Sequence, residues 1–215
     1  QNMTGGRWYN TSVSLPNGNV FTATGSGTGT STTERWSTAG WTLLSGIGWP
    51  AVTDADAGYF KYWHPFVSVA PDGRLLHFGP TDTMHWFTVT GTGSFVNANA
   101  TVPGAHYPKE GCWVMYDEGR VLVAGGGANT TAQSADTSIG TSTNIAYTVN
   151  MNTTPPTLTP TASMQYPRQF VNTVVLPSGE VLVIGGNSPG QKFSDNGSIM
   201  PCEIWNPKTG AWRTV

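Results

Sequence analysis

Charged side chains are scarce in this chain of 215 residues. Only 10% of the residues are charged, and ten Lys and Arg against twelve Asp and Glu give a net charge of −2. Such a surface offers phosphate groups little electrostatic attraction, so nucleic acids and acidic membrane surfaces are not expected as partners. No apolar run approaches the roughly 18 to 20 residues of a membrane-spanning helix, so no membrane span is expected.

Cysteine is nearly absent as well, since Cys112 and Cys202 are the two cysteines of the chain. One pair of cysteines does not establish a disulfide, and a single bridge and two separate buried thiols stay open as alternatives. No signal peptide stands at the start, as in a mature secreted chain or an internal fragment. With 27 Gly and 15 Pro, the composition agrees with an all-β extracellular protein, and we expect it to be secreted.

Glycine, in contrast, is abundant, and it marks an internal repeat. Four times a turn with glycine leads into an apolar strand that stops at another glycine: LPNGNVFTATG (15–25), APDGRLLHFG (70–79), YDEGRVLVAGGG (116–127) and LPSGEVLVIGG (176–186). The turn glycines are Gly18, Gly73, Gly119 and Gly179, with spacings of 55, 46 and 60 residues. A hairpin that repeats about every 50 residues is typical of a kelch-type β-propeller blade.

The remainder of each repeat supports this interpretation. An aromatic-centred strand follows each glycine stop: ERWSTAGWTLL, MHWFTVTGTGSFV, IAYTVNMN and CEIWNPKTGAWRTV. We therefore predict an all-β chain in which residues 1–215 form a partial β-propeller domain of about four blades, with blade hairpins near 9–25, 64–79, 112–127 and 170–186. Because an open arc of four blades would expose two unpaired sheet faces, we expect the chain to be part of a larger ring, which the family resemblance described below implies to be seven-bladed. The remaining blades would come from missing sequence or a second chain.

The first repeat carries a resemblance to a known family. The run GGRWYNTSVSLPNGNVFTATG resembles the blade of galactose oxidase, glyoxal oxidase and related copper radical oxidases that holds their cross-linked tyrosine. In that family an Arg-x-Tyr places its tyrosine nine residues before the turn glycine, and here Arg7-Trp8-Tyr9 precedes Gly18 in the same way. The resemblance continues through the other three repeats in the right blade order and covers nearly the whole chain.

The resemblance implies a role for Tyr9 and a cofactor. Tyr9 would be a copper ligand and the catalytic residue, joined to a cysteine by a thioether and oxidised to the radical that takes a hydrogen atom from the substrate. The family's partner cysteine belongs to the preceding blade, which would lie before Gln1. Its other ligands, a tyrosine followed by a histidine and a second histidine, belong to blades that would follow Val215. The cofactor expected by resemblance is thus copper with a Cys-Tyr thioether radical.

The resemblance also assigns candidate substrate contacts. His64, nine residues before its turn glycine, matches a histidine near the mouth of the galactose oxidase site, and Tyr59 matches as well. The sugar-binding arginine has become Phe60, and Phe193 resembles the aromatic wall that contacts the substrate. Gly27 stands where the tryptophan that covers the radical tyrosine would be. We therefore do not expect galactose as the substrate; small aldehydes, primary alcohols and carbohydrate ends stay open.

These residues also have purely structural explanations. Tyr9 is compatible with an aromatic cap on an inner strand, His64 with a hydrogen-bonded loop or core histidine, and Phe193 with an aromatic that fixes its loop. Arg7 is expected to be structural, bound to a carboxylate or to backbone carbonyls. No metal-like pairing of histidines is visible within the chain.

Two functions follow from these alternatives. The first is a secreted copper radical oxidase that oxidises a primary alcohol or aldehyde with O₂ and releases H₂O₂. The second is a non-catalytic extracellular propeller that acts as a structural or matrix protein or binds glycans. The fold alone does not decide between them, since propellers support many functions.

Overall fold

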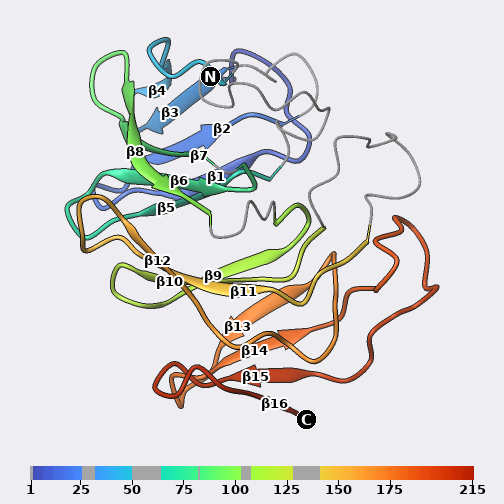
Figure 1. Cartoon of the computed structure of the whole chain (residues 1–215). Coiled ribbons are helices and arrows are strands. Elements are labelled where there is room, and N and C mark those ends of the chain that lie inside the picture. The colour runs from blue at the N-terminus through green and yellow to red at the C-terminus, as the bar shows by residue number, and fades with distance from the viewer. Residues whose placement is uncertain (1, 26–31, 50–63, 82, 103–107, 128–140) are drawn as a thin grey trace. The chain divides into compact units, whose positions relative to one another are not determined.

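The computed structural model describes residues 2–25, 32–49, 64–81, 83–102, 108–127 and 141–215, and the structural statements below concern these residues. They form sixteen strands in four antiparallel sheets of four (Figure 1). The chain divides into two compact units, Gln1–Ala100 and Thr101–Val215. The prediction of an all-β chain with four four-stranded blades is confirmed.

The first unit holds two of the sheets, and in each sheet the strand order follows the chain. The first sheet consists of β1 (Thr11–Ser14), β2 (Val20–Ala23), β3 (Thr33–Ser37) and β4 (Gly40–Leu43). The second consists of β5 (Phe66–Val69), β6 (Leu75–Gly79), β7 (Thr83–Thr88) and β8 (Ser94–Thr101). Such up-and-down sheets are the units from which propellers are built.

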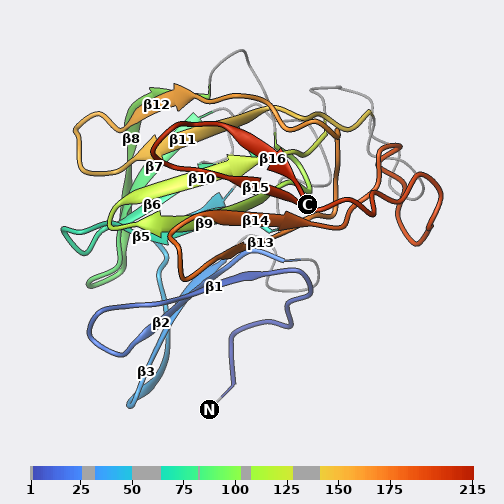
Figure 2. The same ribbon diagram turned by 90° about the horizontal axis from the view of Figure 1, so that it is seen from below.

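The second unit repeats this pattern with two further sheets (Figure 2). One consists of β9 (Cys112–Asp117), β10 (Arg120–Ala124), β11 (Ala146–Asn150) and β12 (Thr157–Pro160). The other consists of β13 (Asn172–Val175), β14 (Val181–Ile184), β15 (Glu203–Trp205) and β16 (Trp212–Thr214). The first strands of the two sheets, β9 and β13, are linked, because Thr173 Oγ1 donates a 3.1 Å hydrogen bond to the Trp113 carbonyl.

The turn glycines of the repeat occupy the tight turns between the first and second strand of each sheet. Gly18 has a φ of 80° and Gly73 a φ of 84°, a conformation that glycine adopts without a steric penalty. The Gly18 N–H donates to the Leu15 carbonyl at 3.0 Å, which closes the turn. These turns set the register that brings Val13 opposite Phe21. That residues 1–215 form a partial β-propeller domain with blade hairpins at the predicted bounds stays a prediction.

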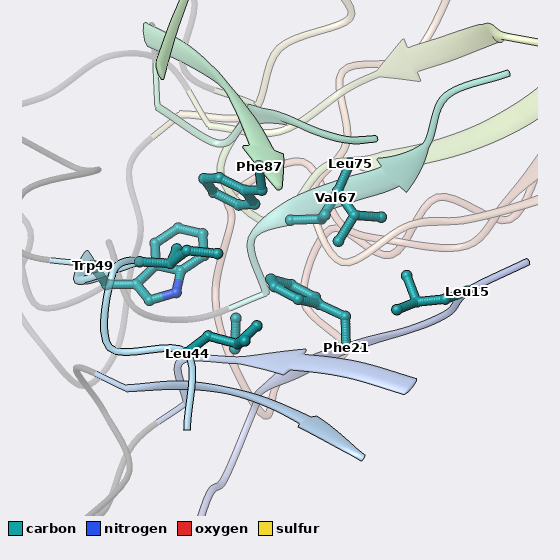
Figure 3. Packing of buried hydrophobic residues seen from close by; sticks show 9 residues of the cluster. Leu15, Phe21, Leu44, Trp49, Val67, Leu75 and Phe87 are labelled. Carbon is teal, nitrogen blue, oxygen red and sulfur yellow. The ribbon is translucent and has the colours of Figure 1, made fainter. Parts of the chain in front are cut away.

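Apolar side chains from both sheets of the first unit form its core (Figure 3). Phe21 of β2 and Phe87 of β7 point toward one another, with ring centroids 5.9 Å apart. Trp49, which is fully buried, packs edge-on against Phe87, and its Nε1 donates a 2.9 Å hydrogen bond to Thr33 Oγ1. The buried members of this cluster are Leu15, Phe21, Ala23, Leu44, Ile47, Trp49, Val67, Leu75 and Phe87.

The core of the second unit is built in the same way from Cys112, Leu122, Ala124, Ala146, Met164, Val171, Val181, Val183 and Trp205. Both cysteines are free thiols, so the structure supports the alternative of two separate thiols rather than a bridge. Burial raises the pKa of the Cys112 thiol to about 12. Among the described residues, no helix is long and apolar enough to cross a membrane.

Candidate active site

Tyr9 lies just before β1, where the chain turns into the first blade. Its backbone is left-handed, with a φ of 63°. The ring of the preceding residue, Trp8, stacks on the Tyr9 ring with centroids 4.0 Å apart and an interplanar angle of 23°. Trp8 is 57% exposed, and its ring covers one face of the Tyr9 ring. The sequence left open what would cover Tyr9 in place of Gly27; Gly27 lies outside the described residues, and Trp8 supplies a cover.

The structure brings His64 to Tyr9, although 55 residues separate them. Their ring centroids are 4.9 Å apart with an angle of 47° between the planes. The His64 N–H donates a 3.0 Å hydrogen bond to the Tyr9 carbonyl. Beside it, Thr11 Oγ1 donates to the Pro65 carbonyl at 2.8 Å and ties the two blades together at the same edge. Two residues predicted separately thus form one phenol–imidazole pair.

A hydrogen-bonded pair of left-handed residues like Tyr9 and His64 recurs in the second unit, at positions that no sequence motif marked. Glu110 and Phe170 stand nine residues before their turn glycines, as Tyr9 and His64 do, and both have left-handed backbones with φ of 54° and 56°. The Phe170 N–H donates a 2.7 Å hydrogen bond to the Glu110 carbonyl. The nine-residue offset from the turn glycine is therefore the signal that identifies all four positions.

Glu110 brings a titratable group to the edge of the second unit. Burial raises the pKa of its carboxyl group, and the nearby positive charge of Lys192 opposes this effect. Lys192 directly precedes Phe193, a predicted substrate contact that is 93% exposed and has a φ of 53°. The exposed Phe193 ring therefore directly follows Lys192, whose charge lies near the Glu110 carboxyl group. The other two predicted substrate contacts, Tyr59 and Phe60, lie outside the described residues.

Arg7, the first residue of the Arg-Trp-Tyr motif, is held in a buried ion pair. Its Nη2 donates a 2.6 Å hydrogen bond to Glu34 Oε2, and both side chains are completely buried. Burial by itself would raise the pKa of Glu34, but the hydrogen bonds from Arg7 and Thr4 and the Arg7 charge outweigh it and lower the pKa. The structural role expected for Arg7, bound to a carboxylate, is what the structure shows.

Gly25, two residues after the end of β2, allows the chain around Tyr9 to pack closely. A Cβ at Gly25 would lie 2.8 Å from the Trp8 carbonyl oxygen and 3.1 Å from the Asn10 nitrogen, whereas a Cβ at Gly18 would meet nothing within 4 Å. Both glycines have positive φ, so alanine costs roughly 1 to 2 kcal/mol at either position from the backbone alone.

We therefore expect Gly25→Ala to destabilise the protein by clearly more than Gly18→Ala, because it also pushes against the backbone on both sides of Tyr9. Urea denaturation of the two variants measures the difference. Amide hydrogen exchange at His64, whose N–H is bound to the Tyr9 carbonyl, should be faster in Gly25→Ala alone. Equal losses of stability in the two variants would contradict this account of Gly25.

Comparisons with known proteins find two oxidases that the chain resembles. A curated galactose oxidase of Gibberella zeae is 27% identical to the chain over 214 residues. The solved structure of a fungal alcohol oxidase of the AA5 family, in complex with copper, covers 100% of the chain at 28% identity with a TM-score of 0.88. The chain is thus similar to galactose oxidase and to a copper-containing alcohol oxidase of the AA5 family.

The chain matches only part of each of these relatives. The chain spans 31% of the length of the galactose oxidase and 44% of the alcohol oxidase chain. The structure of YjhT covers 98% of the chain with a TM-score of 0.67 at 10% identity, a likeness of fold alone. A search of family models found no match.

Proposed function

We propose that this chain provides the tyrosine side of the copper site in a secreted oxidase that converts a primary alcohol or aldehyde with O₂ and releases H₂O₂. The observation that carries the proposal is the position of Tyr9. It stands in the family's Arg-x-Tyr motif at a blade edge, stacked on Trp8 and paired with His64. The 28% identity to a copper-bound alcohol oxidase extends over the whole chain and supports the same function.

The residues present fit one part of a copper site. Tyr9 is half-buried at the edge of its blade, and its phenolate oxygen is a donor that suits Cu(II). Among the described residues no group of three or more His, Cys, Asp or Glu could hold a metal, so further ligands would have to come from other blades. Copper, together with Tyr9 joined to a cysteine by a thioether, would accept the two electrons that leave the alcohol.

The residues around Tyr9 would protect and orient the reacting groups. Trp8 covers one face of the phenol and keeps water from it. His64 lies against Tyr9, where its imidazole can hydrogen-bond a substrate hydroxyl. We propose Tyr59, Phe60 and Phe193 as further substrate contacts. Since Phe60 replaces a sugar-binding arginine, we favour a small alcohol, an aldehyde or a carbohydrate end over galactose.

The rest of the predicted assembly remains part of this proposal. We propose that the four blades belong to a seven-bladed ring of the kelch type, whose other blades come from additional sequence or from a second chain. The short span of the chain relative to its relatives supports this. The low charge and the high glycine and proline content support secretion.

Tyr9 provides the test of this function. In the intact protein loaded with Cu(II), we expect peptide mass spectrometry to find Tyr9 joined to a cysteine peptide, two hydrogens short of the sum. Tyr9→Phe should abolish this product and lower oxidase activity by roughly four orders of magnitude, the scale of losing an essential catalytic group. Tyr116→Phe, which changes a phenol packed on Trp205, is the matched control and should keep both.

An unmodified Tyr9 peptide from copper-loaded protein would contradict the oxidase proposal. The alternative function, a non-catalytic propeller that binds glycans or serves as a matrix protein, would then remain. Failure to detect H₂O₂ from both the wild type and Tyr9→Phe would also contradict the oxidase proposal.

A further inference from the structure

The buried Arg7–Glu34 pair does more than neutralise two charges, because it connects three segments of the first blade. Arg7 Nη1 donates hydrogen bonds to the carbonyls of Thr24 at 3.0 Å and Thr32 at 2.9 Å. Glu34 Oε1 in turn accepts hydrogen bonds from the backbone N–H and the hydroxyl of Thr4, both at 2.8 Å. The segment before Tyr9 is thereby attached to the end of β2 and to the start of β3.

The second unit contains the same network in its last blade. Arg168 stands eleven residues before its turn glycine, as Arg7 does, and its Nη2 donates to Glu203 Oε2 at 2.7 Å. Arg168 Nη1 donates to the Gly185 carbonyl at 2.9 Å, and Nη2 also donates to the Pro201 carbonyl at 3.1 Å. We call Arg7 with Glu34 the first clamp and Arg168 with Glu203 the second clamp.

Each clamp holds a left-handed residue that lies two positions after its arginine. In the first blade this residue is Tyr9, and in the last blade it is Phe170. A left-handed backbone costs a residue with a side chain roughly 1 to 2 kcal/mol, so it persists only where surrounding contacts enforce it. Both arginines are completely buried and use a planar guanidinium that binds several acceptors at once. The two clamps are among the contacts that hold Tyr9 and Phe170.

The position of the Tyr9 ring follows from this arrangement. Thr4 and Arg7 attach the segment that leads into Tyr9 to the end of β2 and the start of β3, and the Tyr9 ring contacts those of Trp8 and His64. A group that binds a metal and reacts with a substrate must be held within about 0.5 Å of its productive position. If the clamp were loosened, the Tyr9 phenol would move away from its productive position although the sequence motif is intact.

We propose that the Arg7–Glu34 clamp sets the position of the Tyr9 phenol, which makes Arg7 a positioning residue of the oxidase. The role in oxidation rests on the proposed function, whereas the control of the Tyr9 backbone does not. The second clamp holds a phenylalanine, which has no hydroxyl to bind a metal. Any effect of Arg7 on copper chemistry should therefore have no counterpart at Arg168, even though the two clamps are alike in structure.

The test compares Arg7→Lys with Arg168→Lys, because lysine keeps the charge but cannot reproduce the forked hydrogen bonds. Amide hydrogen exchange is the first measurement, and it needs no copper. We expect Arg7→Lys to speed exchange at the His64 amide, which is bound to Tyr9, by about tenfold while Phe170 is unaffected. Arg168→Lys should do the reverse. If Arg7→Lys does not fold, Glu34→Gln, which leaves Arg7 in place, takes its role.

The second measurement uses the intact, copper-loaded protein. Both variants should lower the unfolding temperature alike, but Arg7→Lys alone should alter the Cu(II) EPR spectrum and reduce cross-linking of Tyr9. Its kcat should fall by about a hundredfold with KM nearly unchanged, the effect of misplacing a reacting group.

The outcomes separate this inference from the proposed function. A wild-type protein that binds no copper would refute the function, while a selective effect of Arg7→Lys on His64 exchange would still support the clamp. Copper binding and activity that persist unchanged in Arg7→Lys, or His64 exchange that stays at the wild-type rate, would overturn the positioning role of Arg7.

Discussion

Replacing Arg168 by methionine is expected to lower the free energy of unfolding by about 3 to 5 kcal/mol, the scale of breaking one side of a buried ion pair. Glu203 is 1% exposed and would keep a hydrogen bond from the Gln165 N–H, but its charge would lose the guanidinium 2.7 Å away. The carbonyls of Gly185 and Pro201 would lose their donor as well. The loss thus combines an unpaired buried charge with unsatisfied backbone groups.

An exposed ion pair in the same unit provides the control. Arg213 Nη2 lies 2.9 Å from Glu180 Oε2, but the arginine side chain is 53% exposed. Pairs of this kind contribute about 0 to 1 kcal/mol, since water solvates the separated charges. Urea denaturation should therefore show Arg213→Met close to the wild type and Arg168→Met far below it. Similar losses in the two variants would mean that burial of the Arg168–Glu203 pair has no energetic consequence.

Acidification is expected to destabilise the first unit through His77. This residue is fully buried on β6, where its ring stacks against those of His85 at 5.7 Å and Phe87 at 5.9 Å. Burial, aided by the charge of His85, lowers the pKa of His77 from 6.5 to about 3, against a weak opposing effect of the Gly79 backbone. The unfolded chain therefore binds a proton at pH values at which the folded chain does not.

The sign of the effect follows from this difference. Stability is full above pH 6.5 and falls as the pH drops from 6.5 toward 3, by about 1.4 kcal/mol per pH unit from His77 alone. Between pH 7.5 and pH 5 the wild type should lose about 2 kcal/mol more than His77→Leu, as urea denaturation at the two pH values measures.

A core variant that keeps His77 distinguishes the effect of His77 protonation from a general loss of core packing. Phe87→Leu removes a ring that packs on His77 and should lower stability at both pH values by a similar amount, so that its pH dependence matches the wild type. If His77→Leu keeps the full pH dependence of the wild type, another group causes the acid sensitivity.

Much of the fold could be predicted because its signals are local. A turn such as that around Gly18 depends on a positive φ at one position, and the strands beside it depend on apolar residues a few positions away. Repetition of this local pattern at Gly73, Gly119 and Gly179 then identified four sheets. Each of these features involves residues that are close in sequence, so it can be recognised from the sequence alone.

The candidate site could be predicted from such local signals only in part. Tyr9 and His64 could be named from their offset to the turn glycine and from the family resemblance, yet their contact with one another appeared only in the structure. Glu110 and Phe170 share the same offset but carry side chains that no motif marked. What these two residues contact depends on the path of the folded backbone and not on residue type.

By itself, the sequence determined the class of fold, the number of blades in this chain and the position of Tyr9 in its motif. The tertiary structure alone decided which carboxylates hold the arginines. Glu34 lies 27 residues after Arg7, Glu203 lies 35 residues after Arg168, and the two spacings differ because the intervening loops differ in length. A buried charge takes its partner from whatever the folded chain brings within hydrogen-bond distance, and that proximity arises from packing rather than from spacing.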